Sequence, residues 1–236
     1  MTAFQETALA LTAIYIVLVV VRFRKSTIVL IGGLVAVALF TVAALARGAV
    51  TLDQLGLRVP DSWLATIGFA VVWLGVMYAY SPVADWIASR YFAKPPTLGT
   101  FRAIQESRAK LIAGIVVAWL LGGILEELVF RGIVLRTVEL LVSGWTIGAV
   151  AAAVAVLVAA VGAGLMHLYQ GPRAAVIITQ LSVLFGVLFV VSGYNLWAVM
   201  LCHGMYDTVA FIRFANKKSK YSNLDKTEAP LSETPA

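Results

Sequence analysis

One long apolar stretch of the chain, residues 111–142, reads LIAGIVVAWLLGGILEELVFRGIVLRTVELLV. It is longer than the roughly 20 apolar residues with which an upright helix crosses a bilayer. It also carries charged side chains in its middle, namely Glu126, Glu127 and Arg131. A charge at the bilayer centre costs at least about 2.5–3.5 kcal/mol on the insertion scale, so such groups normally face a protein interior and have partners. The stretch therefore predicts a membrane helix that carries a buried polar site.

The composition of the whole chain also places it in a membrane. Of its 236 residues, 61% are hydrophobic and 13% are charged, whereas soluble domains have about 25% charged residues. A compact domain of this size has too little interior for so many apolar side chains. These values exclude a soluble enzyme, a nucleic-acid-binding domain and a disordered chain. The single cysteine, Cys202, excludes a disulfide framework and a multi-cysteine metal site.

Hydropathy predicts an all-α transmembrane bundle of about seven spans. Their ranges are Thr7–Val21, Thr27–Ala46, Trp63–Tyr80, Leu111–Val142, Ile147–Leu165, Ala174–Val191 and Leu196–Phe214. Basic residues follow the first apolar run instead of preceding it, so we expect an uncleaved anchor, not a signal peptide. Lysine and arginine gather in alternate connections, which predicts the N-terminus outside and the C-terminus in the cytoplasm.

The chain divides into three predicted regions. Residues 1–110 hold the N-terminal spans, an outer linker and an inner connector, residues 111–215 hold the core with the charged side chains, and residues 216–236 form a disordered tail. Within the connector, Thr97–Lys110 has apolar residues three apart among basic ones. This spacing favours an interfacial amphipathic helix, with a solvated connector as the alternative.

Six ionisable residues lie inside predicted spans, away from the span ends. They are Glu126, Glu127, Arg131, His167, His203 and Asp207. Glu127 and Arg131 are four apart, with the glutamate N-terminal, which favours an ion pair on a helix. Glu126 is rotated by about 100° from Glu127 and stays free to exchange a proton. His203 and Asp207 repeat the spacing of four on the last span, so both side chains can face one place.

Most familiar intramembrane catalytic patterns do not fit. The chain has no HExxH sequence for a zinc protease and no Gly-x-Ser-Gly for a serine protease. Tyr206-Asp207 resembles half of an aspartyl protease site, but no second membrane aspartate completes a pair. Cys202 directly precedes His203, so the two side chains diverge on a helix, and a thiolate nucleophile would lack an aligned base.

The motifs Glu126-Glu127-x-x-x-Arg131, His167 and His203-x-x-x-Asp207 resemble those of the CPBP/Abi family, which includes the CAAX prenyl proteases and bacteriocin-processing and immunity proteins. The resemblance covers roughly residues 119–214, and EELVFRG (126–132) and HLYQG (167–171) are similar to bacterial members. The family has phenylalanine four residues before the second-motif histidine, where this chain has Ala163. The departure affects the shape of the pocket more than its chemistry.

The resemblance implies an intramembrane endopeptidase in which Glu126 and His167 activate a water molecule. It implies that His203 and its partner Asp207 face the oxyanion. An ionised Asp207 cannot stabilise an oxyanion directly, so it would either orient His203 and favour its charged form, or be protonated itself. No cofactor is expected, although Glu126, His167, His203 and Asp207 are ligand types that leave a zinc site open as the alternative. The expected partners are the bilayer and a membrane-associated or leader-peptide substrate, in a bacterial plasma membrane.

Two other functions remain open from the sequence. One is a member of the same family that acts without proteolysis, as a bacteriocin-immunity or scaffold protein. The other is a proton-coupled carrier that uses the same residues as a relay, although carriers usually show paired repeats and broken helices.

Overall fold

The predicted spans from Thr27 onward form helices in the computed structural model of the protein, which describes residues 7–8, 11–12, 14–15, 18 and 27–227. The elements are α2 (Thr27–Ala46), α3 (Trp63–Tyr91), the 3-10 helix η1 (Gly99–Gln105), α4 (Arg108–Ala118), the π-helices η2 (Trp119–Glu126) and η3 (Leu128–Leu135), α5 (Arg136–Ser143), α6 (Gly148–Met166), the 3-10 helix η4 (His167–Gln170), α7 (Pro172–Val191) and α8 (Leu196–Thr227). The described residues contain no β-strand, which confirms the all-α prediction.

Four helical segments among the described residues are long and apolar enough to cross a membrane. They are Trp63–Tyr91, Arg108–Ser143, Gly148–Gln170 and Pro172–Val191. The predicted total of seven spans is not confirmed by this set. The first predicted span, Thr7–Val21, lies largely outside the described residues.

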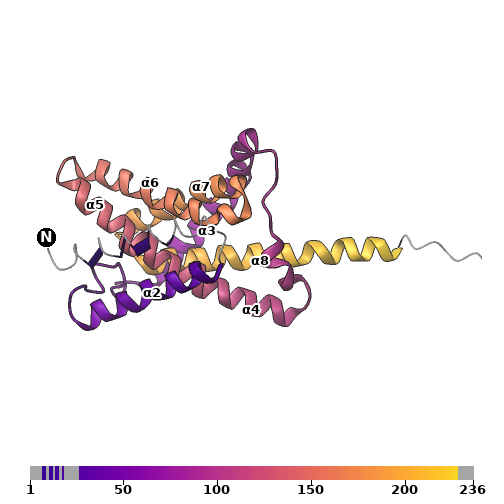
Figure 1. Cartoon of the computed structure of the whole chain (residues 1–236), viewed down its shortest axis with the longest axis horizontal. Coiled ribbons are helices and arrows are strands. Elements are labelled where there is room, and N and C mark those ends of the chain that lie inside the picture. Colours follow the sequence, from indigo (N-terminus) through magenta and orange to yellow (C-terminus); the bar gives the residue numbers. More distant parts are fainter. Residues whose placement is uncertain (1–6, 9–10, 13, 16–17, 19–26, 228–236) are drawn as a thin grey trace, which may run out of the picture.

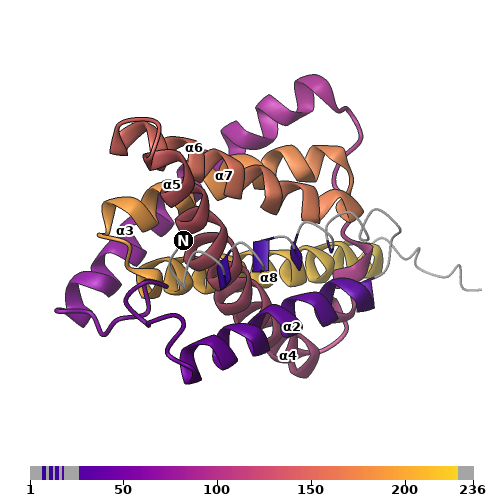
Figure 2. The same ribbon diagram turned by 60° about the vertical axis from the view of Figure 1, so that its left-hand side comes forward.

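The segment Arg108–Ser143 continues without a break from α4 through η2, Glu127 and η3 into α5. Ser107 caps its N-terminus by accepting a hydrogen bond from the Lys110 backbone amide. π-Helical geometry is rare, usually lasts a single turn and is frequent at functional sites, yet here it covers both sides of Glu127. In Figure 2 this long segment crosses α8.

Helix α3 is longer than predicted, because it continues past Tyr80 and through Pro82 to Tyr91. The predicted span ended at Tyr80, where the apolar run stops. The structure shows that Asp85, in the continuation, forms a two-pronged ion pair with Arg173 of α7, at 2.8 and 2.7 Å. Because the charge is paired, the helix can extend along α7 in this part of the bundle.

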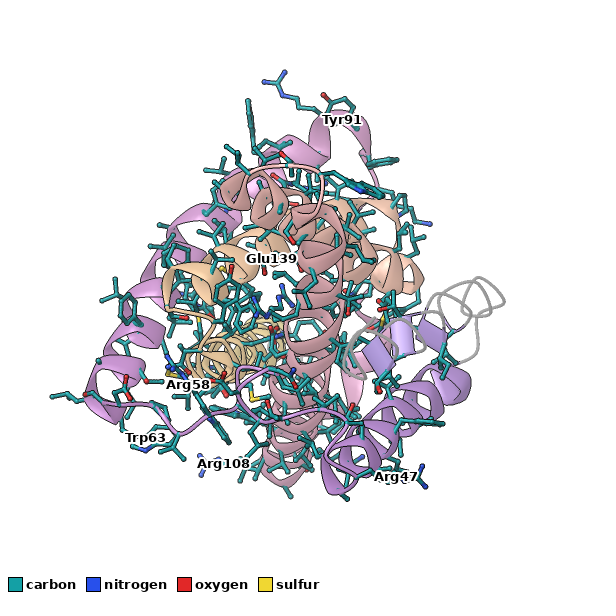
Figure 3. The ribbon with its side chains drawn as sticks, turned by 90° about the vertical axis from the view of Figure 1, so that its left-hand side faces the viewer. Arg47, Arg58, Trp63, Tyr91, Arg108 and Glu139 are labelled. Carbon is teal, nitrogen blue, oxygen red and sulfur yellow. The ribbon has the colours of Figure 1, made fainter. Side chains whose placement is uncertain are left out.

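Helices α6 and α7 pack along each other, and α3 packs against both α7 and α8 (Figure 1). The most buried side chains come from η3, α6, α7 and the first half of α8. The long segment Arg108–Ser143 lies between these layers, and Figure 3 shows it in front of α8, which is seen nearly end-on. The charged pair Glu127 and Arg131 therefore lies inside the core of the protein.

Two connections define opposite ends of the bundle. At one end, the Thr97 amide donates to the Gln170 carbonyl and joins the α3–α4 connection to η4. At the other end, the Leu196 amide donates to the Gly56 carbonyl. Gly56 has φ of +76°, and a Cβ on it would lie 2.4 Å from the Tyr194 carbonyl oxygen, so only glycine fits there.

The connector and the tail differ from their predictions. The region Thr97–Lys110 holds the seven-residue η1 and then a break at Glu106–Ser107 before α4, so it is not one continuous amphipathic helix. Helix α8 reaches Thr227, so residues 217–227 are helical where disorder was predicted. A helix nucleated by packed residues can propagate into polar residues of adequate propensity. Residues 228–236 lie outside the described residues.

We predict that Gly164→Ala destabilises the protein. A Cβ on Gly164 would lie 1.9 Å from the Thr179 hydroxyl oxygen and 2.7 Å from the Ala175 carbonyl oxygen, and overpacking typically costs about 1–3 kcal/mol. The matched control is Gly75→Ala in α3, where a Cβ has no heavy atom within 4 Å. Thermal unfolding in detergent should show a lower melting temperature for Gly164→Ala alone. Equal melting temperatures for both variants would contradict the packing described here.

Candidate active site

Three separate helical elements bring the predicted polar residues together. Glu126 ends η2, Glu127 links η2 to η3, and Arg131 lies in η3. His167 begins η4 directly after α6, and His203 and Asp207 lie one turn apart on α8. The helix crossing seen in Figure 2 places the first and third motifs against each other.

The side chains of Glu127 and Arg131 form a fully buried ion pair. Their side chains are 0% and 2% exposed, and Arg131 Nη1 donates to Glu127 Oε1 at 3.0 Å. Arg131 Nη2 also donates to the Ser182 carbonyl and hydroxyl oxygens, at 2.8 and 2.6 Å. A buried ion pair is stable only if its geometry and its remaining hydrogen bonds compensate for the lost hydration of the two charges. Ser182 supplies part of that compensation from α7.

The same Glu127 oxygen binds the third motif. His203 Nδ1 lies 2.6 Å from Glu127 Oε1. An ionised carboxylate only accepts hydrogen bonds, so Nδ1 is the donor and carries a proton. The ring of Phe185 stacks on the imidazole, with centroids 4.7 Å apart. Glu127 therefore fixes both the tautomer and the orientation of His203, a role that the sequence left open to Asp207.

Asp207 lies on the other side of the His203 imidazole. The distance from His203 Nε2 to Asp207 Oδ2 is 3.6 Å, which suits an ion pair but is too long for a good hydrogen bond. Both groups face the backbone of Gly122, where a Cβ would lie 2.9 Å from Asp207 Oδ2 and 3.4 Å from His203 Nε2. Glycine at position 122 thus lets the long segment approach His203 and Asp207 closely.

Glu126 differs from its neighbour in its surroundings. Its side chain is half-buried, and its charge lies near enough to His203 and Asp207 to act on both. It accepts no hydrogen bond from any residue of the described ranges. The two adjacent glutamates therefore differ: Glu127 is buried and bonded, and Glu126 is half-buried without a hydrogen bond from the described residues.

His167 is held by backbone geometry. Its Nδ1 lies 2.9 Å from the carbonyl oxygen of Ala163, which can only accept, so Nδ1 carries the proton and Nε2 is left open. His167 also lies near Asp207. The contact to Ala163 uses only its backbone, so it does not depend on the phenylalanine of the family pattern.

The expectation of no cofactor and the zinc alternative both stay predictions. Among the side chains described by the structure, no group of three or more His, Cys, Asp or Glu is arranged to hold a metal ion. The Nδ1 of His203 is also already bound to Glu127.

Sequence reasoning did not identify several residues that build the site. It missed Ser182 and Phe185 on α7, and the close glycine contact of Gly123 with Gly204, where a Cβ on Gly123 would lie 3.3 Å from the Gly204 amide nitrogen. Small residues are enriched where helices of a membrane bundle pack closely. The Gly122-Gly123 pair is therefore a sequence signal for such a close contact. The Glu127–His203 contact joins residues 76 positions apart, so no local sequence pattern predicts it.

Comparison with known proteins agrees with the resemblance. Residues 108–209 match the family described as type II CAAX prenyl endopeptidase Rce1-like, and this range includes all six polar residues. Neither a curated protein nor a solved structure gives a match. The family supports a protease, and its match together with the four apolar helices supports an integral membrane protein. Residues 108–209 are thus an Rce1-like domain, which confirms the resemblance to the CPBP and CAAX protease family.

Proposed function

We propose that the protein is an intramembrane endopeptidase that hydrolyses peptide bonds with a water molecule activated by Glu126. The observation that carries the proposal is the division of labour between two adjacent glutamates. Glu127 is buried and bound to Arg131 and His203. Glu126 is half-buried beside His203 and Asp207, with no hydrogen bond from the described residues. The Rce1-like match over the same residues supports this chemistry.

In the proposed reaction, Glu126 acts first as a base and then as an acid, and each histidine has one role. Glu126 takes a proton from the water, whose second hydrogen is held by Nε2 of His167, and the oxygen attacks the carbonyl carbon. His203, fixed through Nδ1 and protonated at Nε2, donates to the resulting oxyanion. Collapse of the intermediate breaks the C–N bond, and Glu126 gives its proton to the leaving amine. The products are one carboxylic acid and one amine, so atoms and charge balance.

Charge balance favours a protonated His203 in this scheme. The site holds three carboxylates, those of Glu126, Glu127 and Asp207, and one guanidinium, that of Arg131. This leaves excess negative charge in a low-dielectric region. Asp207, at 3.6 Å from Nε2, further favours the charged imidazole. We propose that Asp207 supports His203 in this way and does not contact the oxyanion itself.

The substrate class follows from the location of the site. Glu126, Glu127 and Arg131 lie in Arg108–Ser143 and His167 lies in Gly148–Gln170, two of the segments that are long and apolar enough to cross a membrane. We therefore propose a membrane-associated protein or a leader peptide as the substrate. The alternative is a member that confers bacteriocin immunity or acts as a scaffold without proteolysis. Retained phenotype in Glu126→Ala, with no peptide cleaved by the wild type, would favour that alternative.

We predict that Glu126→Gln impairs activity and that Glu127→Gln impairs stability. Glu126→Gln should abolish cleavage with little change in stability, because an amide keeps the shape but cannot take a proton. Glu127→Gln should lower stability, because removing one charge of a buried pair typically costs about 3–5 kcal/mol. Peptide cleavage and thermal unfolding in detergent measure the two effects. Full activity in Glu126→Gln, or equal loss of stability in both variants, would refute the assignment.

We also predict that cleavage does not depend on metal. Activity should survive extensive chelation, and elemental analysis should find well under one zinc per chain, because in the proposed reaction Glu126 and His167 activate the water without a metal. His203→Ala should bind substrate but slow turnover by about 100–1,000-fold, the usual cost of a lost oxyanion donor. Stoichiometric zinc that is released by both His167→Ala and His203→Ala would make these residues ligands and overturn the mechanism.

We propose that the protein lies in a bacterial plasma membrane with its N-terminus outside and its C-terminus in the cytoplasm. The structure brings the α3–α4 connection and the start of α7 to one end of the bundle. This end carries Arg90, Lys94, Arg102, Arg108, Lys110 and Arg173, whereas the opposite end carries Arg47, Arg58 and Arg136. The more basic end is cytoplasmic by the positive-inside rule.

Reporter fusions test this orientation. Alkaline phosphatase fused after Arg47 should be active, because that end faces the oxidising exterior, and the same reporter fused after Lys220 should be inactive. A cytoplasmic reporter at both positions is the complementary control. Active phosphatase after Lys220, or inactive phosphatase after Arg47, would reverse the proposed orientation.

A further inference from the structure

Tyr15 is a buried hydroxyl group in the N-terminal segment, outside the range of the family match. The residue is 6% exposed. Its hydroxyl has no hydrogen-bond partner among the residues that the structure describes. A buried hydroxyl without a partner is unfavourable, and such groups normally bind another polar group or an internal water.

The side chain of Tyr15 contacts η3 and α6, which adjoin the elements that carry Glu126 and His167. Its ring packs edge-on against Phe130, with centroids 5.1 Å apart and planes at 87°, and Phe130 is four residues after Glu126 on the same helical segment. An ideal Cβ on Gly162 would lie 3.6 Å from the Tyr15 hydroxyl oxygen. Gly162 directly precedes Ala163, whose carbonyl holds His167. The hydroxyl is thus bounded by η3 on one side and by the end of α6 on the other.

The charged neighbours of the hydroxyl belong to the same site. Among the described residues, the charged side chains of Glu126 and Arg131 lie close enough to Tyr15 to interact with it electrostatically. Glu126 itself accepts no hydrogen bond from a described residue. Two nearby polar groups that lack direct partners fit a shared internal water, which typically makes two to four hydrogen bonds in proteins.

We propose that the Tyr15 hydroxyl donates a hydrogen bond to the water that Glu126 activates, and so belongs to the active site. A water oxygen has four directions of interaction. Its two hydrogens bind Glu126 and Nε2 of His167, and one lone pair accepts from Tyr15. The other lone pair then points at the scissile carbonyl. Tyr15 keeps its own proton throughout, so its contribution is orientation of the nucleophile.

The proposal rests on the proposed hydrolytic function, and it needs one test with substrate and one without. The variant is Tyr15→Phe, which keeps the ring against Phe130 and Gly162 and removes only the hydroxyl. The matched control is Tyr80→Phe on α3, which removes a hydroxyl that binds Gln180 at 3.0 Å, away from the site.

With a peptide that the wild type cleaves, Tyr15→Phe should lower kcat by about 10–100-fold, the effect of a misplaced reacting group. KM and the melting temperature should stay near those of the wild type, and Tyr80→Phe should keep the wild-type kcat. An unchanged kcat in Tyr15→Phe overturns the proposal. So does a fall in kcat that is matched by loss of folded protein, because Tyr15 would then only support packing.

Without substrate, infrared spectra can report the phenol C–O band of Tyr15, identified by its loss in Tyr15→Phe. Glu126→Gln should shift this band, because the charged group that holds the shared water becomes neutral. An unshifted band overturns the proposal. If the wild type cleaves no peptide but the band shifts, the proposed hydrolysis fails and the link from Tyr15 to Glu126 stands.

Discussion

A single buried carboxylate oxygen, Oε1 of Glu127, accepts hydrogen bonds from both Arg131 and His203. This contact joins the long helical segment to α8, and Arg131 extends it to α7 through Ser182. Buried charges are tolerated when they are paired and hydrogen-bonded, so the three helices must keep their positions for any one of these groups to remain inside. The placement of the other polar residues follows from this network.

The backbone around Glu127 makes the network possible. Glycines at positions 122, 123 and 204 let the long segment and α8 approach closely, and Trp119 packs on Gly204 while its indole donates to Thr208 at 2.9 Å. The π-helical backbone on both sides of Glu127 changes the directions in which successive side chains point. One glutamate therefore enters the core while the adjacent one stays near His203 and Asp207.

Much of this arrangement could be predicted from the sequence, and the rest depends on tertiary contacts. Continuous apolar runs predicted the helices, and the spacing of Glu127 and Arg131 predicted their ion pair. The extension of α3 past Tyr80 could not be predicted, because the partner of Asp85 is on another helix. The bond from Glu127 to His203 and the π-helical backbone also leave no local signal, so the sequence offered Asp207 as a residue that could orient His203.

A double-mutant cycle on Glu127 and His203 measures the central contact most directly. The unfolding free energy in detergent would be compared for the wild type, Glu127→Gln, His203→Gln and the double variant. If the carboxylate holds the imidazole, the two losses are not additive, and the coupling falls within the range of about 0.5–3 kcal/mol that is typical of contacting residues. Losses that add to within about 0.3–0.5 kcal/mol, as for independent sites, would show that Glu127 does not join these helices.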